Sequence, residues 1–190
     1  MVTLLIAYLL VGGAAVYLAV CVAAFIGLLR RRGERADAFP TVSVIIAARN
    51  EEHNIGAVLD DLLAQTYPAD RFDITVVNDC SEDGTAAVAG EYAARSGRIS
   101  LRETGNSKSP YSHKKKAVHE GIMESDGEIV MTVDADCRVP RNWIGDMVSH
   151  FRPGVDLVAG EILVEGGGLM GWLESLEFTG IQMMSAGLMN

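Results

Sequence analysis

The sequence has few cysteines and histidines, and neither set has the spacing of a metal site or a disulfide framework. The cysteines are odd in number and contain no Cys-x-x-Cys pair, so no disulfide framework or zinc site is expected. The histidines lack ligand spacing and are expected to be polar surface or hydrogen-bonding groups. The three cysteines are Cys21, Cys80 and Cys137, and the four histidines are His53, His113, His119 and His150.

The beginning of the chain lacks charge, because no charged side chain precedes Arg30. The apolar run from Leu4 to Leu29 exceeds the roughly 20 residues that cross a bilayer, and it predicts a transmembrane helix over residues 1–29. A buried core helix is a poorer interpretation, because such a helix is rarely apolar on every face. A cleaved signal peptide would begin with positive charge and have a shorter apolar region.

Basic residues follow this run directly, in a short linker over residues 30–40 that contains Arg30, Arg31, Arg32 and Arg35. By the positive-inside rule they stay in the cytoplasm, which predicts a single-pass membrane protein whose remaining chain is cytoplasmic. The same arginines are suited to contact anionic lipid headgroups. The net charge of −9 argues against nucleic acid as a partner, since the other strong basic cluster is only Lys114–Lys116.

From residue 41 on, short apolar runs alternate with segments of helical periodicity. This alternation predicts an α/β fold with a mostly parallel sheet and helices on both faces. The expected strands are Val42–Ala48, Ile74–Val77, Ile99–Leu101, Glu128–Val133 and Val155–Ala159, the last with a continuation at Ile162–Val164. The expected helices are Glu51–Gln65, Thr85–Ala94, Lys114–Glu124 and Asn142–Phe151.

The last segment, Leu169–Met189, has an apolar stripe at helical spacing. We interpret it first as a core helix. The alternative is a helix that lies at a membrane surface.

Two aspartates separated by one residue follow the predicted strand at Glu128–Val133. In an extended strand, residues two apart project to the same side, so Asp134 and Asp136 are expected to present two carboxylates to one point. Paired carboxylates suit Mg²⁺ or Mn²⁺ that carries a phosphate.

Two other polar clusters follow predicted strands, at residues 47–52 and 78–85. In open parallel sheets, ligands bind outside the carboxyl ends of the strands, so the three clusters are expected to gather at one edge. Taken singly, each is compatible with ordinary turn chemistry. Ser81 or Asp83 would cap the next helix and Gly84 would supply a tight turn.

In order and spacing, these segments resemble the family 2 glycosyltransferases, which are inverting enzymes with a GT-A nucleotide-binding fold. The resemblance covers Pro40 to about Val164. The matching pieces are PTVSVIIAARNEE at Pro40–Glu52, VVNDCSEDGT at Val76–Thr85, HKKKAVHEGI at His113–Ile122 and VMTVDADCRVPRNWI at Val130–Ile144. It implies a GT-A-like domain over residues 41–190 that moves a sugar from a nucleotide-sugar donor, most often a UDP-sugar, to a polysaccharide or lipid acceptor.

The resemblance also implies roles for residues after the first two strands. Ala48, Arg49 and Glu51 match the loop that borders the nucleoside. Asp79 matches the residue that holds the base, usually uracil, and the ribose, and Asp83 belongs to the same loop.

Three further positions are implied near the diphosphate. Lys114 matches a lysine that opens the following helix near the nucleotide, Asp134 faces the ribose or the metal, and Asp136 binds the metal that bridges the diphosphate. The chain departs from the family pattern at Asn78, which replaces an aspartate, and at Cys80, which replaces a glycine. Asn78 keeps a hydrogen-bonding side chain, so nucleotide binding is still expected.

Elementary electrostatics leads to the same cofactor. A nucleotide diphosphate and a pocket of aspartates repel one another by several kcal/mol at an intermediate effective dielectric. Binding therefore requires a divalent cation, Mg²⁺ or Mn²⁺, with Lys114 as an additional positive charge. The cation would also stabilise negative charge on the leaving diphosphate.

The catalytic base stays unassigned. In the resembled family it comes from a later acidic motif, often followed by Gln-x-x-Arg-Trp, and neither occurs by Asn190. We therefore expect the donor-binding part of a longer enzyme. The non-enzymatic alternative is a membrane-tethered module that binds the nucleotide without transfer.

A third interpretation is a phosphatase of the haloacid dehalogenase type, with Asp134 as nucleophile. Those enzymes place the motif near the start of the domain, with Thr or Val at the position that Arg138 occupies here.

Overall fold

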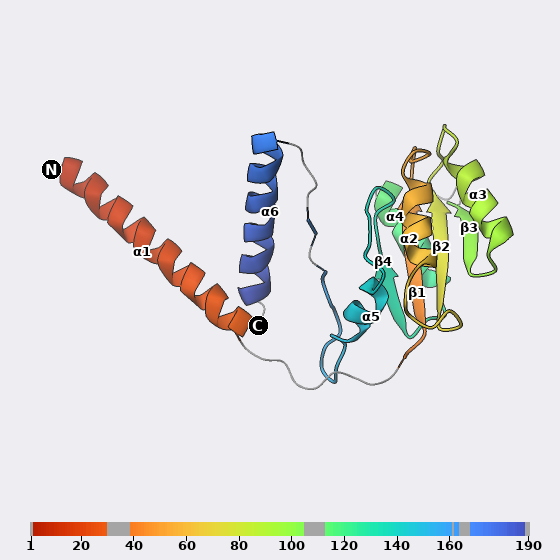
Figure 1. Cartoon of the computed structure of the whole chain (residues 1–190). Helices are drawn as coiled ribbons and strands as arrows, with labels where there is room; N and C mark the ends of the chain where they lie inside the picture. Colours follow the sequence, from red (N-terminus) through yellow and green to blue (C-terminus); the bar gives the residue numbers. More distant parts are fainter. Residues whose placement is uncertain (1, 30–38, 105–112, 161, 164–167, 189–190) are drawn as a thin grey trace. The chain divides into compact units, whose positions relative to one another are not determined.

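The structure is a computed structural model that describes residues 2–29, 39–104, 113–160, 162–163 and 168–188 (Figure 1). Within the helices, residues 2–7, 24, 27–29 and 184–188 are described by their backbone alone. The chain divides into two compact units, one formed by residues 1–34 with 159–190 and the other by residues 35–158. The second unit contains the candidate site.

The second unit is built on a parallel sheet of four strands in the order β3-β2-β1-β4. The strands are β1 (Val42–Ala48), β2 (Phe72–Asn78), β3 (Ile99–Glu103) and β4 (Ile129–Thr132). Three strands end level with one another, because Ala48 pairs with Asn78 and Asn78 pairs with Glu103. Their carboxyl ends therefore form one edge, as the sequence predicts.

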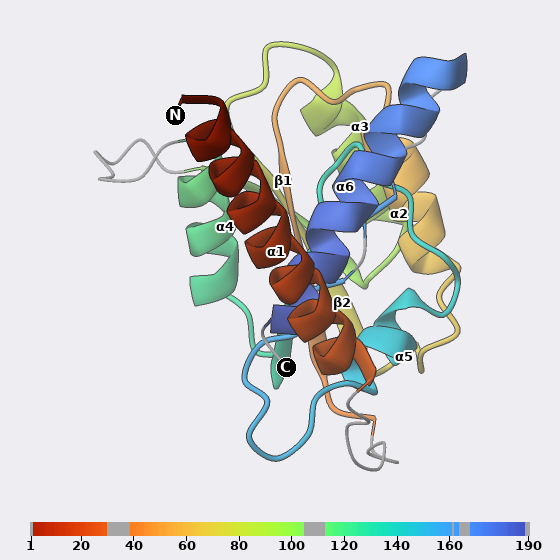
Figure 2. The same cartoon turned by 90° about the vertical axis from the view of Figure 1, so that its left-hand side faces the viewer.

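Helices cover both faces of this sheet. β1 is apolar along nearly its whole length, so its side chains are buried on both sides of the sheet. Val42, Val44 and Ile46 pack into a large cluster with the buried side chains of α2 (Ile55–Leu63), α3 (Thr85–Arg95) and α5 (Trp143–Val148). Ile45, on the alternate side of β1, packs with Ala117 of α4 (His113–Met123). Figure 2 shows α4 on one side of β1 and α2 on the other.

The predicted α/β fold with a parallel sheet is confirmed, and the predicted boundaries of its elements are within two residues of the observed ones except at two helices. α2 begins at Ile55 rather than Glu51, since residues 51–54 form hydrogen-bonded turns before it. The helix predicted at Asn142–Phe151 is shorter, at Trp143–Val148.

The strand predicted at Val155–Ala159 is wrong. Residues 155–160 form no strand, and Leu157 is 84% exposed, so its apolar side chain joins no sheet face. Of the predicted continuation at Ile162–Val164, residues 162 and 163 are not in a strand and residue 164 lies outside the described residues.

The first unit contains two helices that contact each other, α1 (Val2–Leu29) and α6 (Gly168–Leu188). The helix predicted over residues 1–29 is therefore present. Within the described residues, however, we find no helix with both the length and the apolarity required to cross a bilayer, so the transmembrane prediction is not supported. The predicted linker arginines at residues 30–35 lie outside the described residues.

α6 is not a core helix. Its described large apolar side chains are exposed, and Gly171 is its one buried residue among those described.

Candidate functional site

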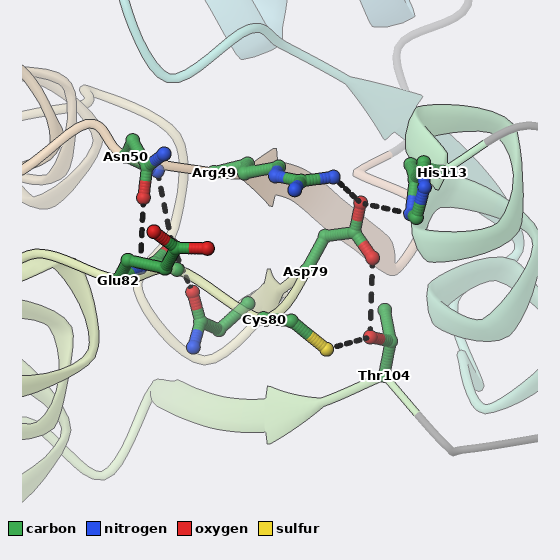
Figure 3. A network of polar contacts seen from close by, with 9 residues as sticks. Arg49, Asn50, Asp79, Cys80, Glu82, Thr104 and His113 are labelled. Carbon is green, nitrogen blue, oxygen red and sulfur yellow. Dashed lines mark hydrogen bonds and ion pairs between the residues drawn. The ribbon is translucent and has the colours of Figure 1, made fainter.

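The candidate site lies where the loops after β1, β2 and β4 meet the beginning of α4. The loops after β1 and β2 are locked together by reciprocal hydrogen bonds. Asn50 N donates to Ser81 Oγ at 3.0 Å, and Glu82 N donates to Asn50 Oδ1 at 2.8 Å. Asn50 adopts a left-handed conformation with φ of 57°, which asparagine tolerates better than most residues. These contacts fix Arg49 and Asp79 on adjacent loops (Figure 3).

Asp83, predicted from the resemblance to belong to the nucleotide loop, extends this lock. Its Oδ2 accepts a hydrogen bond from Glu52 N at 3.1 Å, and its Oδ1 accepts from Thr85 N at 3.0 Å. Partial burial acts to raise the pKa of Asp83, but the hydrogen bonds from Thr85 and Glu52 outweigh it and lower that pKa. Glu52 reciprocates by accepting from Gly84 N at 2.7 Å. Asp83 is thus part of the scaffold of the two loops.

The same scaffold includes Ala48 and Glu51. The carbonyl oxygen of Ala48 accepts a hydrogen bond from Asp79 N at 2.9 Å. Glu51 N donates to Thr85 Oγ1 at 2.7 Å, and Glu51 Oε2 accepts from Asn54 Nδ2 at 2.8 Å. Both residues therefore border the loop that carries Asp79.

Asp79 is the buried charge of the site, with 6% of its side chain exposed. Oδ1 accepts a hydrogen bond from Thr104 Oγ1 at 3.2 Å. Oδ2 is buried and accepts no hydrogen bond from the part of the chain that the structure describes. Two basic groups face Oδ2, Arg49 Nη1 at 3.9 Å and His113 Nδ1 at 3.5 Å (Figure 3). A buried carboxylate oxygen needs a donor, so this atom is prepared to accept a hydrogen bond from a ligand.

Of the two departures from the resembled pattern, Asn78 has a structural explanation and Cys80 has none. Asn78 is buried, and its Nδ2 donates to both carboxylate oxygens of Glu103 on β3, at 2.8 and 3.0 Å. An aspartate there would place two carboxylates against each other. Cys80 has φ of 52° and an exposed side chain whose Sγ lies 3.6 Å from Thr104 Oγ1. The position needs the left-handed conformation that glycine adopts freely.

Asp134 and Asp136 lie in a turn rather than on a strand, which corrects the geometry assumed from the sequence. β4 ends at Thr132, and Cys137 N donates to the Asp134 carbonyl at 3.1 Å, which closes the turn. Ala135 is buried between the two aspartates, and both aspartates are exposed. The turn, and not strand alternation, therefore exposes this pair of acids.

The beginning of α4 joins the two halves of the site. His113 faces Asp79, and the next residue, Lys114, places its Nζ 2.8 Å from Asp134 Oδ2. β2 and β4 are not neighbours in the sheet, because β1 lies between them. One helix terminus thus contacts the acidic loops of both strands, and its backbone N–H groups favour negative charge.

The donor set fits Mg²⁺ or Mn²⁺ that keeps several non-protein ligands. Asp134 and Asp136 provide hard carboxylate oxygens, and no cluster of three or more potential ligand residues occurs among the described residues. Mg²⁺ is commonly held by one or two carboxylates together with substrate phosphates and water. The predicted metal residues are therefore chemically suited to the cation.

The structure brings together most of the predicted site residues, and it adds two. Arg49 and Asp79 meet at one end, Lys114 and Asp134 meet at the other, and Ala48, Glu51 and Asp83 support the loops. His113 and Thr104 were missed. His113 directly precedes Lys114, so its place at the start of a basic helix terminus was the available signal. No sequence signal pointed to Thr104, because its position beside Asp79 depends on the pairing of β2 with β3.

Comparison with known proteins identifies a family. The family described as glycosyl transferase family 2 matches residues 43–186. Glycosyltransferase AglE of Haloferax volcanii is 33% identical over 124 residues, which cover 65% of this chain and 40% of that protein. The beta-monoglucosyldiacylglycerol synthase of a Synechocystis species is 31% identical over 113 residues, which cover 60% of this chain and 23% of that protein. The chain thus spans less than half the length of these curated relatives.

A solved structure supports the fold assignment. The mannosyltransferase from Pyrobaculum calidifontis, determined in complex with GDP-Man and Mn²⁺, superposes with a TM-score of 0.57 at 26% sequence identity. The match covers 72% of this chain and 42% of that protein. The architecture is therefore GT-A-like.

Proposed function

Because this chain belongs to glycosyl transferase family 2, we propose that it binds a nucleotide-sugar, preferably a UDP-sugar, with Mg²⁺ or Mn²⁺ and serves an inverting, metal-dependent sugar transfer. The acceptor would be a glycan or a lipid. Family membership argues against the phosphatase of the haloacid dehalogenase type. The match over residues 43–186 supports a donor-binding domain that extends over most of residues 41–190.

One observation carries this proposal: the beginning of α4 contacts both acidic loops. Asp79 Oδ2, buried and available to a donor group, would accept a hydrogen bond from the nucleoside. Lys114 and the N-terminus of α4 would face the diphosphate beside Asp134. The nucleoside and the diphosphate of one ligand would therefore occupy the two ends of the site.

The acidic and the basic side chains of the site would have different roles. Asp134 and Asp136 would hold the cation, which when bound offsets the negative charge of the leaving diphosphate. Lys114 would exchange its ion pair with Asp134 for the phosphates. Arg49, whose Nη1 lies 3.9 Å from Asp79 Oδ2, would offset the charge of that carboxylate beside an anionic ligand, and His113 Nδ1 lies 3.5 Å from the same oxygen.

The direct test is calorimetric titration of the full chain with UDP, with and without Mn²⁺, beside an assay of UDP release from UDP-sugars. We expect UDP binding that depends on Mn²⁺. Asp136→Ala should abolish that dependence and leave the thermal unfolding temperature unchanged, because the side chain is exposed. Undiminished Mn²⁺-dependent binding in this variant would contradict the metal assignment.

The same experiment separates transfer from binding alone. Release of UDP in the presence of an acceptor extract supports the transferase. Binding of UDP without release supports the alternative, a nucleotide-binding module. A preference for GDP over UDP would contradict the proposed uracil nucleotide. It would leave the proposal of a nucleotide-sugar donor intact.

We also propose that the protein works at a membrane with this domain on the cytoplasmic side. The exposed apolar side chains of α1 support membrane contact, among them Leu9, Leu10 and Val11.

A further inference from the structure

We propose that Asp61 is a positioning residue for the cation site: through Arg138 it holds the turn that carries Asp134 and Asp136 in the arrangement that binds the metal. This inference rests on the proposed function, and it concerns a residue of α2 whose side chain, within the described residues, hydrogen-bonds to Arg138 and Val139.

The contact between Asp61 and Arg138 is a bidentate ion pair. Arg138 Nε lies 2.6 Å from Asp61 Oδ2, and Arg138 Nη2 lies 2.8 Å from Asp61 Oδ1. Val139 N also donates to Asp61 Oδ2, at 3.2 Å. The two parallel N–H donors of a guanidinium fix its plane as well as its position, so the pair restrains the orientation of the chain.

Asp61 is well placed to restrain its partner, because its side chain is only 18% exposed whereas that of Arg138 is 65% exposed. The aspartate belongs to a helix that packs into the core through Val58 and Leu62. The ion pair therefore links a rigid element to an exposed segment that begins two residues after Asp136.

Neighbouring residues at the end of α2 strengthen this link. Gln65 Nε2 donates to the Pro140 carbonyl at 2.7 Å, and Gln65 Oε1 accepts from Ile144 N at 3.0 Å. Thr66 N donates to the Arg141 carbonyl at 2.8 Å. Asp61 in the last turn of α2 and the residues just after that helix thus hold the segment from Arg138 to Ile144 at several points.

The acidic turn needs such support. Asp134 and Asp136 are exposed carboxylates only two residues apart, and the Lys114 ammonium, 2.8 Å from Asp134 Oδ2, offsets only part of their repulsion. If the segment after Asp136 were free, the two carboxylates would separate, and metal binding would have to order them. Groups that orient metal ligands from outside the coordination sphere commonly change metal affinity 10- to 100-fold.

The chain offers a matched control in the adjacent residue of the same helix. Asp60 accepts a hydrogen bond from Tyr92 of α3 at 2.8 Å, away from the acidic turn. Asp60→Asn and Asp61→Asn therefore remove the same charge from neighbouring positions, and only the second weakens the contact with Arg138.

The experiment is a titration of the full chain with Mn²⁺ at a fixed UDP concentration, followed by titration with UDP at saturating Mn²⁺. For Asp61→Asn we expect about a tenfold or larger increase in the apparent Kd for Mn²⁺. Affinity for UDP at saturating Mn²⁺ should change less than threefold. Asp60→Asn should leave both affinities at the wild-type values.

Wild-type Mn²⁺ affinity in folded Asp61→Asn would overturn the positioning role and leave the proposed function intact. Absence of Mn²⁺-dependent UDP binding in the wild-type chain would overturn both. If Asp61→Asn does not fold, Arg138→Gln replaces it, because Arg138 is exposed. That variant should show the same loss of Mn²⁺ affinity, and wild-type affinity in it overturns the role of the pair.

Discussion

At the scale of single residues, Asp79 combines burial with an oxygen that no described donor satisfies. We expect Asp79→Asn to weaken UDP binding about tenfold or more at saturating Mn²⁺, since a hydrogen bond to a charged group contributes about 1.5–3 kcal/mol. Affinity for inorganic pyrophosphate should stay unchanged, because that ligand has no nucleoside. Calorimetry with both ligands measures the difference.

Asp70→Asn is the control for this prediction, since Asp70 is 83% exposed and precedes β2 at the opposite end of the strand. It should change neither affinity. An equal loss of UDP and pyrophosphate affinity in Asp79→Asn would show that Asp79 does not contact the nucleoside.

A second residue-scale prediction concerns pH. The hydrogen bonds from the Arg138 side chain lower the pKa of Asp61 below its ordinary value of 3.8 and outweigh partial burial, which acts upward. A lowered folded-state pKa contributes stability above the unfolded-state value, and that stability is lost as pH falls through the folded-state value. In urea unfolding at pH 6, the free energy of unfolding of Asp61→Asn should thus be about 1–3 kcal/mol lower than that of the wild type.

This difference in the free energy of unfolding should shrink once the pH falls below 3.8, where the unfolded chain becomes protonated at Asp61. Asp60→Asn should show a smaller difference at pH 6. A difference between wild type and Asp61→Asn that persists unchanged at pH 3 would contradict the role of the ion pair.

At the scale of elements, the sequence predicts what is periodic and misses what depends on partners. The buried run of β1 and the stripe of Ile55, Val58 and Leu62 in α2 are visible as patterns and form as predicted. The run at Val155–Ala159 is also mostly apolar, but it forms no strand and pairs with none of the four described strands. Composition alone does not distinguish the two cases.

In the candidate site, too, the sequence predicts some features and misses others. The sequence order of the acidic loops predicts their common edge, because parallel strands require it. It does not predict that Asp83 is tied to Glu52 and Thr85, or that His113 faces Asp79. Those contacts depend on how two loops fold back on each other, which has no periodic signature.

Packing of α4 on the sheet gives a prediction at this scale. A Cβ atom at Gly121 would lie 3.2 Å from Val77 Cγ2 and still closer to Ile45 Cγ2, and both side chains are buried. Ile45 is β-branched and has little freedom to move aside. We expect Gly121→Ala to destabilise the protein by about 1–3 kcal/mol in urea unfolding.

Gly90→Ala on α3 is the matched control, because its new Cβ atom would meet Leu101 Cδ2 at an ordinary 3.8 Å. This variant should be neutral or up to about 1 kcal/mol more stable, as alanine favours a helix over glycine. Destabilisation of both variants by the same amount would show that helix α4 is not closely packed at Gly121.

At the scale of the whole molecule, the two units differ in what their surfaces expose. The unit with the parallel sheet encloses its apolar residues between helices and strands. In the other unit, α1 and α6 expose most of their described apolar side chains, including Leu10, Leu18 and Trp172. Contiguous exposed apolar surface marks a site that another apolar phase covers. We propose that membrane lipid covers the exposed apolar side chains of α1.

We therefore expect the full chain to float with vesicles of phosphatidylcholine and phosphatidylglycerol in a density gradient. The double variant Leu10→Asp with Leu18→Asp should lose flotation, since a carboxylate in the apolar phase costs about 2.5–3.5 kcal/mol per residue. Met123→Asp with Leu157→Asp is the matched control, because both residues are exposed in the other unit. Flotation should persist at 1 M salt, where screening weakens contacts between arginine and lipid and leaves apolar burial intact. Failure of the wild-type chain to float, or equal loss in both double variants, would contradict membrane attachment through α1.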